Sequence, residues 1–179
     1  MKQAPQKQSY PWYQVENWAG LEQGDMLPNC PVILPPPELS EKLIGVNEGD
    51  QLQIPTLIEF GNLIIMSQSC DLTQNNITQV LLCAHFPASS LGKDKRNAIR
   101  KEQRPALHMI EKCEIPDFEF ERQIVDFRTI YTLPKDFVVT FALSLNQRVR
   151  LLPPYKEHLS QSFARYFMRV GLPRPLEEE

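Results

Sequence analysis

The order of apolar and polar residues along the chain predicts a mainly β fold, α+β in class, that ends in an amphipathic helix. Residues 63–66 (Leu-Ile-Ile-Met) form a short, partly β-branched apolar run, which is typical of a strand buried on both faces. A polar run, Ser-Gln-Ser-Cys-Asp, follows directly and ends at Asp71. Residues 23–34 read as a turn followed by a first strand, and further strand-like segments cover residues 52–60, 79–87, 105–110, 123–131, 137–143 and 149–152.

The segment 79–87 is expected to pair antiparallel with the strand over 63–69, because turn residues at 74–76 separate the two. Successive side chains of a strand point to opposite faces. One face of this segment should therefore carry Leu81, Cys83 and His85, and the other Val80, Leu82, Ala84 and Phe86. The first strand, within residues 23–34, is broken by two prolines, which cannot donate to a strand ladder, so we expect it at a sheet edge.

Helical spacing is clearest near the end of the chain. Pro153 and Pro154 precede a run in which apolar residues recur every three or four positions, and Gly171 is a natural C-cap. The predicted apolar stripe consists of Tyr155, Leu159, Phe163, Phe167 and Val170. A shorter helix is expected over residues 38–44, ended by Gly45.

The size of the chain, 179 residues with 42% apolar content, predicts one globular domain with appendages. We assign residues 1–22 to an N-terminal tail and aromatic lid, 23–172 to a single domain, and 173–179 to a C-terminal tail. The aromatic residues of the first segment, from Tyr10 to Trp18, favour a lid packed on the core; a stacking platform for nucleic-acid bases is the alternative. Sixteen prolines against seven glycines predict short strands and irregular connections.

The net charge of −3 argues against nucleic-acid attraction over the whole surface, but it leaves room for a local basic patch. That patch is residues 93–104, which hold six positive and two negative charges and should form an exposed helix or loop. A solvated face needs no function, whereas a phosphate-facing arm would bind nucleic acid. The residues predicted for such binding are Lys93, Lys95, Arg96, Arg100, Lys101 and Arg104.

No segment has the composition of a secretory signal or of a membrane span of about 20 apolar residues. We therefore expect a cytoplasmic protein that does not bind membranes and whose four cysteines are reduced. Cys30, Cys70, Cys83 and Cys113 are widely spaced and include no CxxC pair.

The polar run from Ser67 to Asp71 has two interpretations. Serine and aspartate commonly satisfy loose backbone groups where a strand ends in a turn. The same position is also a common place for a site, and metal-independent RNA cleavage needs a base, an acid and a cation beside the phosphate. The candidate catalytic residues are Asp71, Cys70, His108 and Arg104; His85 is a further suitable type, although a histidine on an apolar strand face is usually a core residue.

The same residues could support two other chemistries. Cys83 and His85 could begin a zinc site completed by Cys70, Cys113 or His108, but the spacing matches no compact zinc template. Cys70 could act as a nucleophile, but the neighbouring Asp71 charge disfavours its thiolate. We therefore predict no metal site and no cofactor.

The order of elements resembles the PemK/MazF family of bacterial toxin ribonucleases, which fold as a small SH3-like barrel with a C-terminal helix. Gln-Gly-Asp at 23–25 before a first strand, Leu-Ile-Ile-Met-Ser at 63–67 and Val-Leu-Leu-Cys-Ala-His-Phe-Pro at 80–87 carry the resemblance. Residues 125–130 with 148–152 and the terminal helix look like the family's closing segment. The resemblance implies a barrel of this type, here with a basic helical insertion.

The chain departs from that family where cleavage is concerned. The family usually carries an Arg-Pro pair at the entry to its second strand, and the corresponding residues 59–63 here are Glu-Phe-Gly-Asn-Leu. We therefore expect a binding or assembly subunit of a bacterial defence or toxin–antitoxin type system, with a protein partner or a homodimer, and without catalysis. The alternative is a toxin-like endoribonuclease that cleaves single-stranded RNA.

Overall fold

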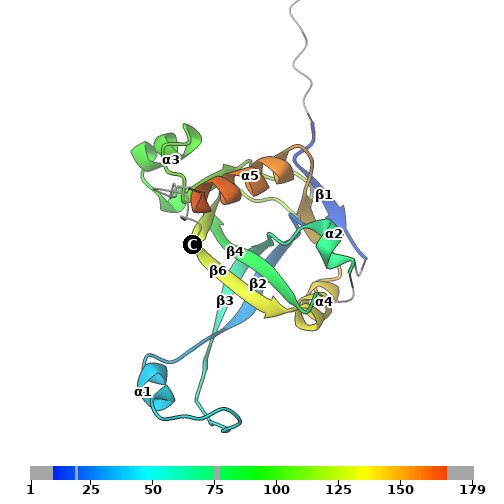
Figure 1. Ribbon diagram of the computed structural model, residues 1–179. Coiled ribbons are helices and arrows are strands. Elements are labelled where there is room, and N and C mark those ends of the chain that lie inside the picture. Colours follow the sequence, from blue (N-terminus) through cyan, green and yellow to red (C-terminus); the bar gives the residue numbers. More distant parts are fainter. Residues whose placement is uncertain (1–9, 19, 75–76, 169–179) are drawn as a thin grey trace, which may run out of the picture.

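The protein is a mixed α+β fold built around a mainly antiparallel sheet, as a computed structural model of residues 10–18, 20–74 and 77–168 describes it (Figure 1). The five-stranded sheet has the order β2 (Met26–Leu34), β3 (Leu57–Ile65), β4 (Gln79–Pro87), β6 (Gln123–Pro134) and β5 (Leu107–Ile110). A separate pair joins β1 (Tyr13–Glu16) to β7 (Arg148–Leu151). The helices are α1 (Leu39–Leu43), α2 (Ser69–Leu72), α3 (Lys93–Arg100), α4 (Lys135–Ser144) and α5 (Tyr155–Phe167), with a 3-10 turn at Ala88–Ser90.

Backbone hydrogen bonds join the two sheets at the start of β2. The Leu151 N–H donates to the Gly24 carbonyl at 2.9 Å, and the Gly24 N–H donates to the Ile65 carbonyl at the same distance. The strands therefore run in one curved series, from β1 and β7 through β2, β3, β4 and β6 to β5. The Tyr13 hydroxyl of β1 donates to the Glu111 carbonyl just after β5, but within the described residues no strand pairing closes the series into a barrel.

Strand β3 is buried on both faces over its second half, which confirms the expectation for residues 63–66. Leu63 and Ile65 face one apolar cluster, which we call the outer cluster, whereas Ile64 and Met66 face a second one, the inner cluster. Strand β4 alternates in the same way: Cys83 lies on the Ile64 side, and its neighbours 80, 82 and 84 lie on the opposite side. The predicted antiparallel pairing of these strands is also confirmed, with Ile64 opposite Cys83.

The inner cluster is covered by α5, whose Leu159 is fully buried and whose Phe163 ring packs edge-on against Phe127 at 5.4 Å between centroids. The aromatic residues near the N-terminus join this layer. The Trp12 ring stacks on Tyr155 with centroids 3.5 Å apart, as a packed lid would. The predicted positions Val170 and Gly171 lie outside the described residues.

The strand predicted over residues 137–143 was wrong, because this segment is the helix α4. Its aromatic and β-branched residues favour a strand by propensity, but tertiary packing overrides that preference. Val138 and Ala142 lie four residues apart and are both buried in the outer cluster. Phe137 and Phe141, again four apart, stack at 6.2 Å. Apolar residues of this segment do recur at helical spacing, but its aromatic and β-branched composition favoured the prediction of a strand.

Strands β2 and β3 continue past the body of the molecule as a two-stranded hairpin that carries α1 near its tip (Figure 1). We call residues 33–60 the arm. The predictions for this region are confirmed: β2 is the edge strand of the five-stranded sheet, and the short helix is followed by Gly45 in a left-handed conformation, at φ +86°. None of the helices formed by the described residues has the length and apolar character to cross a membrane.

Candidate functional site

The base of the arm exposes an apolar surface. Ile33 lies opposite Ile58 in the ladder, and Pro31 lies opposite Phe60. Because directly opposed residues and those two positions apart share a face, these four side chains lie on one face of the hairpin. The relative exposure of Ile33, Ile58 and Phe60 is 66%, 61% and 69%. We call this surface the arm face.

The remainder of the arm is acidic. Residues 33–60 contain five carboxylates and one lysine, which gives the arm a net charge of −4 at neutral pH. The apolar side chains of the arm are not confined to the arm face, since Leu43 and Ile44 of the α1 region are also exposed, at 50% and 83%. An exposed apolar surface with an acidic surround is typical of a protein-binding surface.

The polar run at the end of β3 serves the backbone. The Ser67 hydroxyl accepts a hydrogen bond from the Leu81 N–H at 2.8 Å, and the Ser69 hydroxyl accepts one from the Gln23 N–H at 3.1 Å. Cys70 and Asp71 are part of the single-turn helix α2, and the Cys70 thiol is exposed. The two serine hydroxyls therefore satisfy backbone N–H groups where the strand ends in a turn, which is the first of the two interpretations.

His108 and Arg104 lie together, at β5 and in the turn before it. Both line a small pocket of about 100 Å³, beside Glu102 and the α5 residues Ser162 and Arg165. Burial lowers the pKa of His108 to about 4, partly opposed by the Glu102 charge. The imidazole is therefore neutral at pH 7 and can accept a proton or a hydrogen bond.

The structure does not bring the four predicted catalytic residues together. Figure 1 shows α2, which carries Cys70 and Asp71, at the opposite end of α5 from α3 and the turn that carries Arg104. Helix α5 has 13 residues, so these ends are about 20 Å apart. A single reacting phosphate cannot contact both pairs at once.

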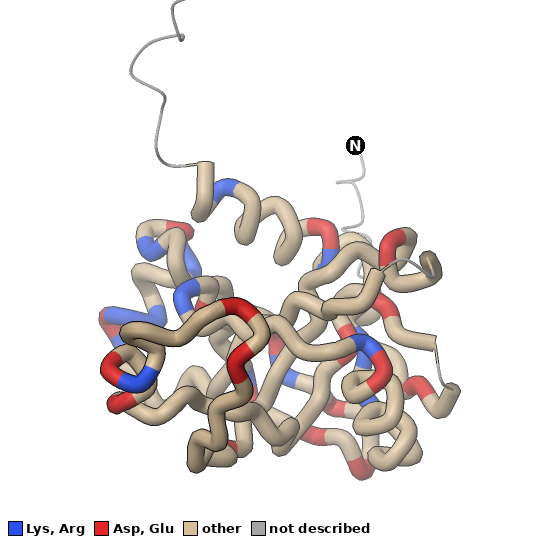
Figure 2. The backbone as a smooth tube through the Cα atoms, turned by 60° about the horizontal axis from the view of Figure 1, so that its bottom comes forward, with Lys and Arg blue, Asp and Glu red and all other residues tan. Residues whose placement is uncertain are grey.

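The basic segment is an exposed helix, α3, followed by a turn. Ile99 anchors the helix in a small apolar cluster with Leu107 and Ile124. Lysines and arginines gather on this side of the molecule, as Figure 2 shows. The residues predicted to bind nucleic acid are exposed except for Arg96, which is half-buried; the exposed ones are Lys93, Lys95, Arg100, Lys101 and Arg104.

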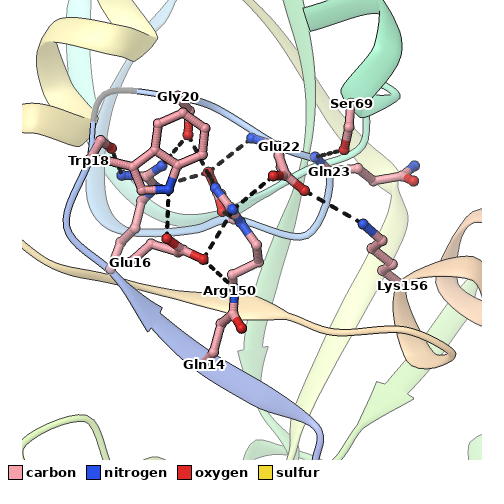
Figure 3. Close-up of polar contacts among 11 residues, drawn as sticks. Gln14, Glu16, Trp18, Gly20, Glu22, Gln23, Ser69, Arg150 and Lys156 are labelled. Carbon is pink, nitrogen blue, oxygen red and sulfur yellow. Dashed lines mark hydrogen bonds and ion pairs between the residues drawn. The ribbon is translucent and has the colours of Figure 1, made fainter.

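A buried ionic cluster, which is not predicted from the sequence, joins β7 to the start of β2 (Figure 3). The fully buried Asp25 carboxylate accepts hydrogen bonds from both Arg148 and Arg150, with the Arg148 Nε 2.8 Å away. Glu16, Glu22 and Lys156 complete the cluster, so three acidic and three basic side chains balance. The sequence feature that could have indicated this cluster is the pair of arginines at alternate positions of the short strand β7.

The arginines of this cluster are engaged by the protein itself. Arg148 also donates to the Trp18 and Gly20 carbonyls, and the Trp18 ring lies over the Arg150 guanidinium, 5.7 Å from its carbon to the ring centroid. We infer that the cluster fixes the geometry of β7 and does not bind a ligand.

The alternative zinc site finds no support in the described residues, where no three His, Cys, Asp or Glu side chains group as metal ligands would. Burial raises the pKa of the Cys83 thiol to about 12, with the Asp126 charge contributing in the same direction. Cys83 is therefore a protonated core residue at neutral pH.

Comparison with models of known protein families gives no match, and no curated protein is significantly similar to the chain.

Proposed function

We propose that this protein is a binding or assembly subunit that engages a protein partner through the arm face. The observation that carries the proposal is the cross-strand group Ile33, Ile58 and Phe60, exposed on one face of a hairpin that projects from the body. Large apolar side chains gathered on an exposed ribbon are costly in water unless a partner covers them. A site that only bound a small molecule would not need such a projection.

A relationship to the PemK/MazF-like barrels is part of the proposal. The curved strand series capped by α5, with the basic helix inserted between β4 and β5, supports an SH3-like barrel of that descent that is open between β1 and β5. The absence of arginine at the entry to β3 supports a subunit without catalysis. On this basis the partner belongs to a bacterial defence or toxin–antitoxin type system.

The chemistry of the arm defines the partner as an apolar surface bordered by positive charge. Residues 93–104 of a second copy carry a net charge of +4, which equals the arm's −4 in magnitude. Opposite charges of this kind steer association and fix orientation. We therefore propose that the arm of one copy docks beside the basic segment of another.

The test is the oligomeric state of matched variants, measured by light scattering after size-exclusion chromatography over a range of concentrations and salt. Phe60→Glu should weaken association at least tenfold, because a charge would be buried in the apolar contact. Leu143→Glu replaces an apolar residue of α4 that is also exposed, at 48%, and should leave association unchanged. A protein that is monomeric throughout would contradict self-assembly, and association that Phe60→Glu leaves unchanged would contradict docking through the arm face.

A second candidate function is cleavage of single-stranded RNA at the basic side of the molecule. The specific observation is that His108 and Arg104 share a pocket next to the exposed cations of α3. Incubation with a mixed RNA pool, with and without chelator, should then give cleavage that His108→Ala and Arg104→Ala abolish. Asp71→Ala is the matched control, because Asp71 lies at the other end of α5. RNA that stays intact at high protein concentration would contradict this second function.

A further inference from the structure

Strand β5 has one edge that no other described strand covers. It is the last strand of the five-stranded sheet and pairs with β6, with Leu107 opposite Asp126. In an antiparallel ladder, every second residue turns its N–H and carbonyl away from the partner strand. The Phe127 N–H donates to the Ala106 carbonyl at 2.9 Å, so residues 106, 108 and 110 face β6, and residues 107, 109 and 111 face outward.

The backbone groups on this outer edge are only partly used. The Leu107 N–H donates to the Arg104 carbonyl of the preceding turn, and the Glu111 carbonyl accepts from the Tyr13 hydroxyl. Met109 lies between them, and within the described residues no backbone group outside β6 hydrogen-bonds to it. Unpaired N–H and carbonyl groups on a strand edge are a template for an added strand.

A hollow follows this edge of β5. Two adjoining pockets, of about 230 and 100 Å³, share three lining residues, and together they are lined by every residue from Leu107 to Glu111. Both faces of the strand take part, since Ile110 belongs to the inner cluster and Met109 packs on the cluster of Ile99. Side chains of opposite faces meet in one hollow only at the edge of a strand. We call this hollow the furrow.

The furrow is positively charged. Four arginines and two glutamates line it and give it a net charge of +2; they are Arg100, Arg104, Arg122, Arg165, Glu102 and Glu111. The Arg122 guanidinium is held by the Glu111 carboxylate, with the Nε 2.7 Å away. Arg100 and Arg104 form no ion pair with any residue that the structure describes, so their charges are available to an acidic partner.

The arm of a second copy contains a strand that matches the furrow. The part of β3 that lies in the arm, residues 57–60, pairs with β2 on one side, and the ladder between β3 and β4 begins only at Leu63. These four residues include no proline, so each keeps its N–H donor, whereas β2 contains Pro28 and Pro31. Glu59 adds a negative charge, within an arm of net charge −4.

We propose that residues 57–60 of one copy lie in the furrow of another and pair with the outer edge of β5. This docking rests on the proposed function and identifies the surface that receives the arm. Main-chain hydrogen bonds to Met109 supply affinity, and the arginines of the furrow orient the acidic arm.

A proline at position 109 tests the pairing. Met109→Pro removes the outward N–H and leaves the ladder between β5 and β6, which does not use that group. Met109→Ala is the matched control, because it loses the same side chain and keeps the N–H. Light scattering over a range of concentrations should show self-association at least tenfold weaker for Met109→Pro than for Met109→Ala, the effect of one lost hydrogen bond.

Amide hydrogen exchange on the unmodified protein covers the case in which Met109→Pro does not fold. Exchange of the Met109 N–H should slow at least tenfold as the protein concentration rises through the association range, and Phe60→Glu should abolish that slowing. Association that Phe60→Glu weakens, but that is equal in the two Met109 variants or leaves Met109 exchange unchanged, would overturn docking in the furrow and keep the arm face as the contact. A protein that is monomeric throughout would overturn both.

Discussion

The two halves of strand β3 have the same apolar character and opposite surroundings. Ile64, in the half that crosses the body, is fully buried between β2 and β4 under α5. Ile58, six residues earlier on the same strand, is 61% exposed on the arm. The comparison shows that an apolar strand residue stabilises the fold only where a second layer covers it. Where none does, the same side chain is available to another molecule.

The largest loss of stability should come from a substitution at Asp25, whose carboxylate is fully buried. Asp25→Asn leaves two buried arginines with too little negative charge, and breaking a buried ion pair costs about 3 to 5 kcal/mol of the free energy of unfolding. Urea unfolding followed by circular dichroism measures this. Asp50→Asn, an exposed turn residue of the arm, is the matched control and should stay within about 0.5 kcal/mol. Equal effects of the two substitutions would mean that the cluster does not hold β7.

The comparison between the halves of β3 is tested most directly with one substitution at two positions. Ile64→Ala should lower the free energy of unfolding by about 2 to 5 kcal/mol, because it leaves a cavity in the inner cluster. Ile58→Ala should change it by less than about 0.5 kcal/mol and should instead weaken self-association. A large loss of stability for Ile58→Ala would show that the arm face is already covered within the monomer.

Acid should weaken the body through its buried histidines. Burial lowers the pKa of His85 from 6.5 to about 4, so the unfolded chain takes up a proton at a higher pH than the folded one. Stability is then retained above pH 6.5 and lost as the pH falls toward 4, by about 3 kcal/mol for His85 alone.

The check is the free energy of unfolding of the wild type and of His85→Phe at pH 7 and near pH 4. The variant should lose about 3 kcal/mol less on acidification, because the carboxylates contribute equally to both proteins. Parallel pH profiles would mean that His85 is not buried as a neutral ring.

Shortening the arm should have the smallest effect on the fold. Leu34 and Leu57 are the last paired residues of the hairpin, so an Asn-Gly turn can join them in place of residues 35–56. The free energy of unfolding should change by no more than about 1 kcal/mol, because few contacts of the body are lost. A protein that no longer folds would show that the arm belongs to the core.

The sequence predicted the strand order through residues 63–87 because burial on both faces leaves a continuous apolar run with turns on either side. It predicted α5 because the stripe from Tyr155 to Phe163 keeps one helical period. It failed at α4, where the β-branched residues Val138 and Val139 pointed to a strand and the covering layer decided otherwise.

The ionic cluster and the furrow could not be predicted, since both depend on contacts between distant segments. No residue near Asp25 in the sequence indicates that Arg148 and Arg150 neutralise its charge. His108 lies on a predicted strand, but its place in the furrow depends on where β5 lies in the sheet. Which of the candidate residues at the strand ends lie together could not be predicted either, because only the folded chain fixes the distance between strand ends.

The buried cluster also has a consequence for the order in which the protein is made. Asp25 and Arg148 are 123 positions apart, and Tyr13 of β1 pairs with Leu151. Contacts of such long range slow folding, since most of the chain must be in place before they form. A nascent chain that has emerged only as far as β6 holds Asp25 without its guanidinium partners and β1 without a neighbour. Synthesis of β7 therefore marks the moment at which the N-terminal third of the protein can complete its fold.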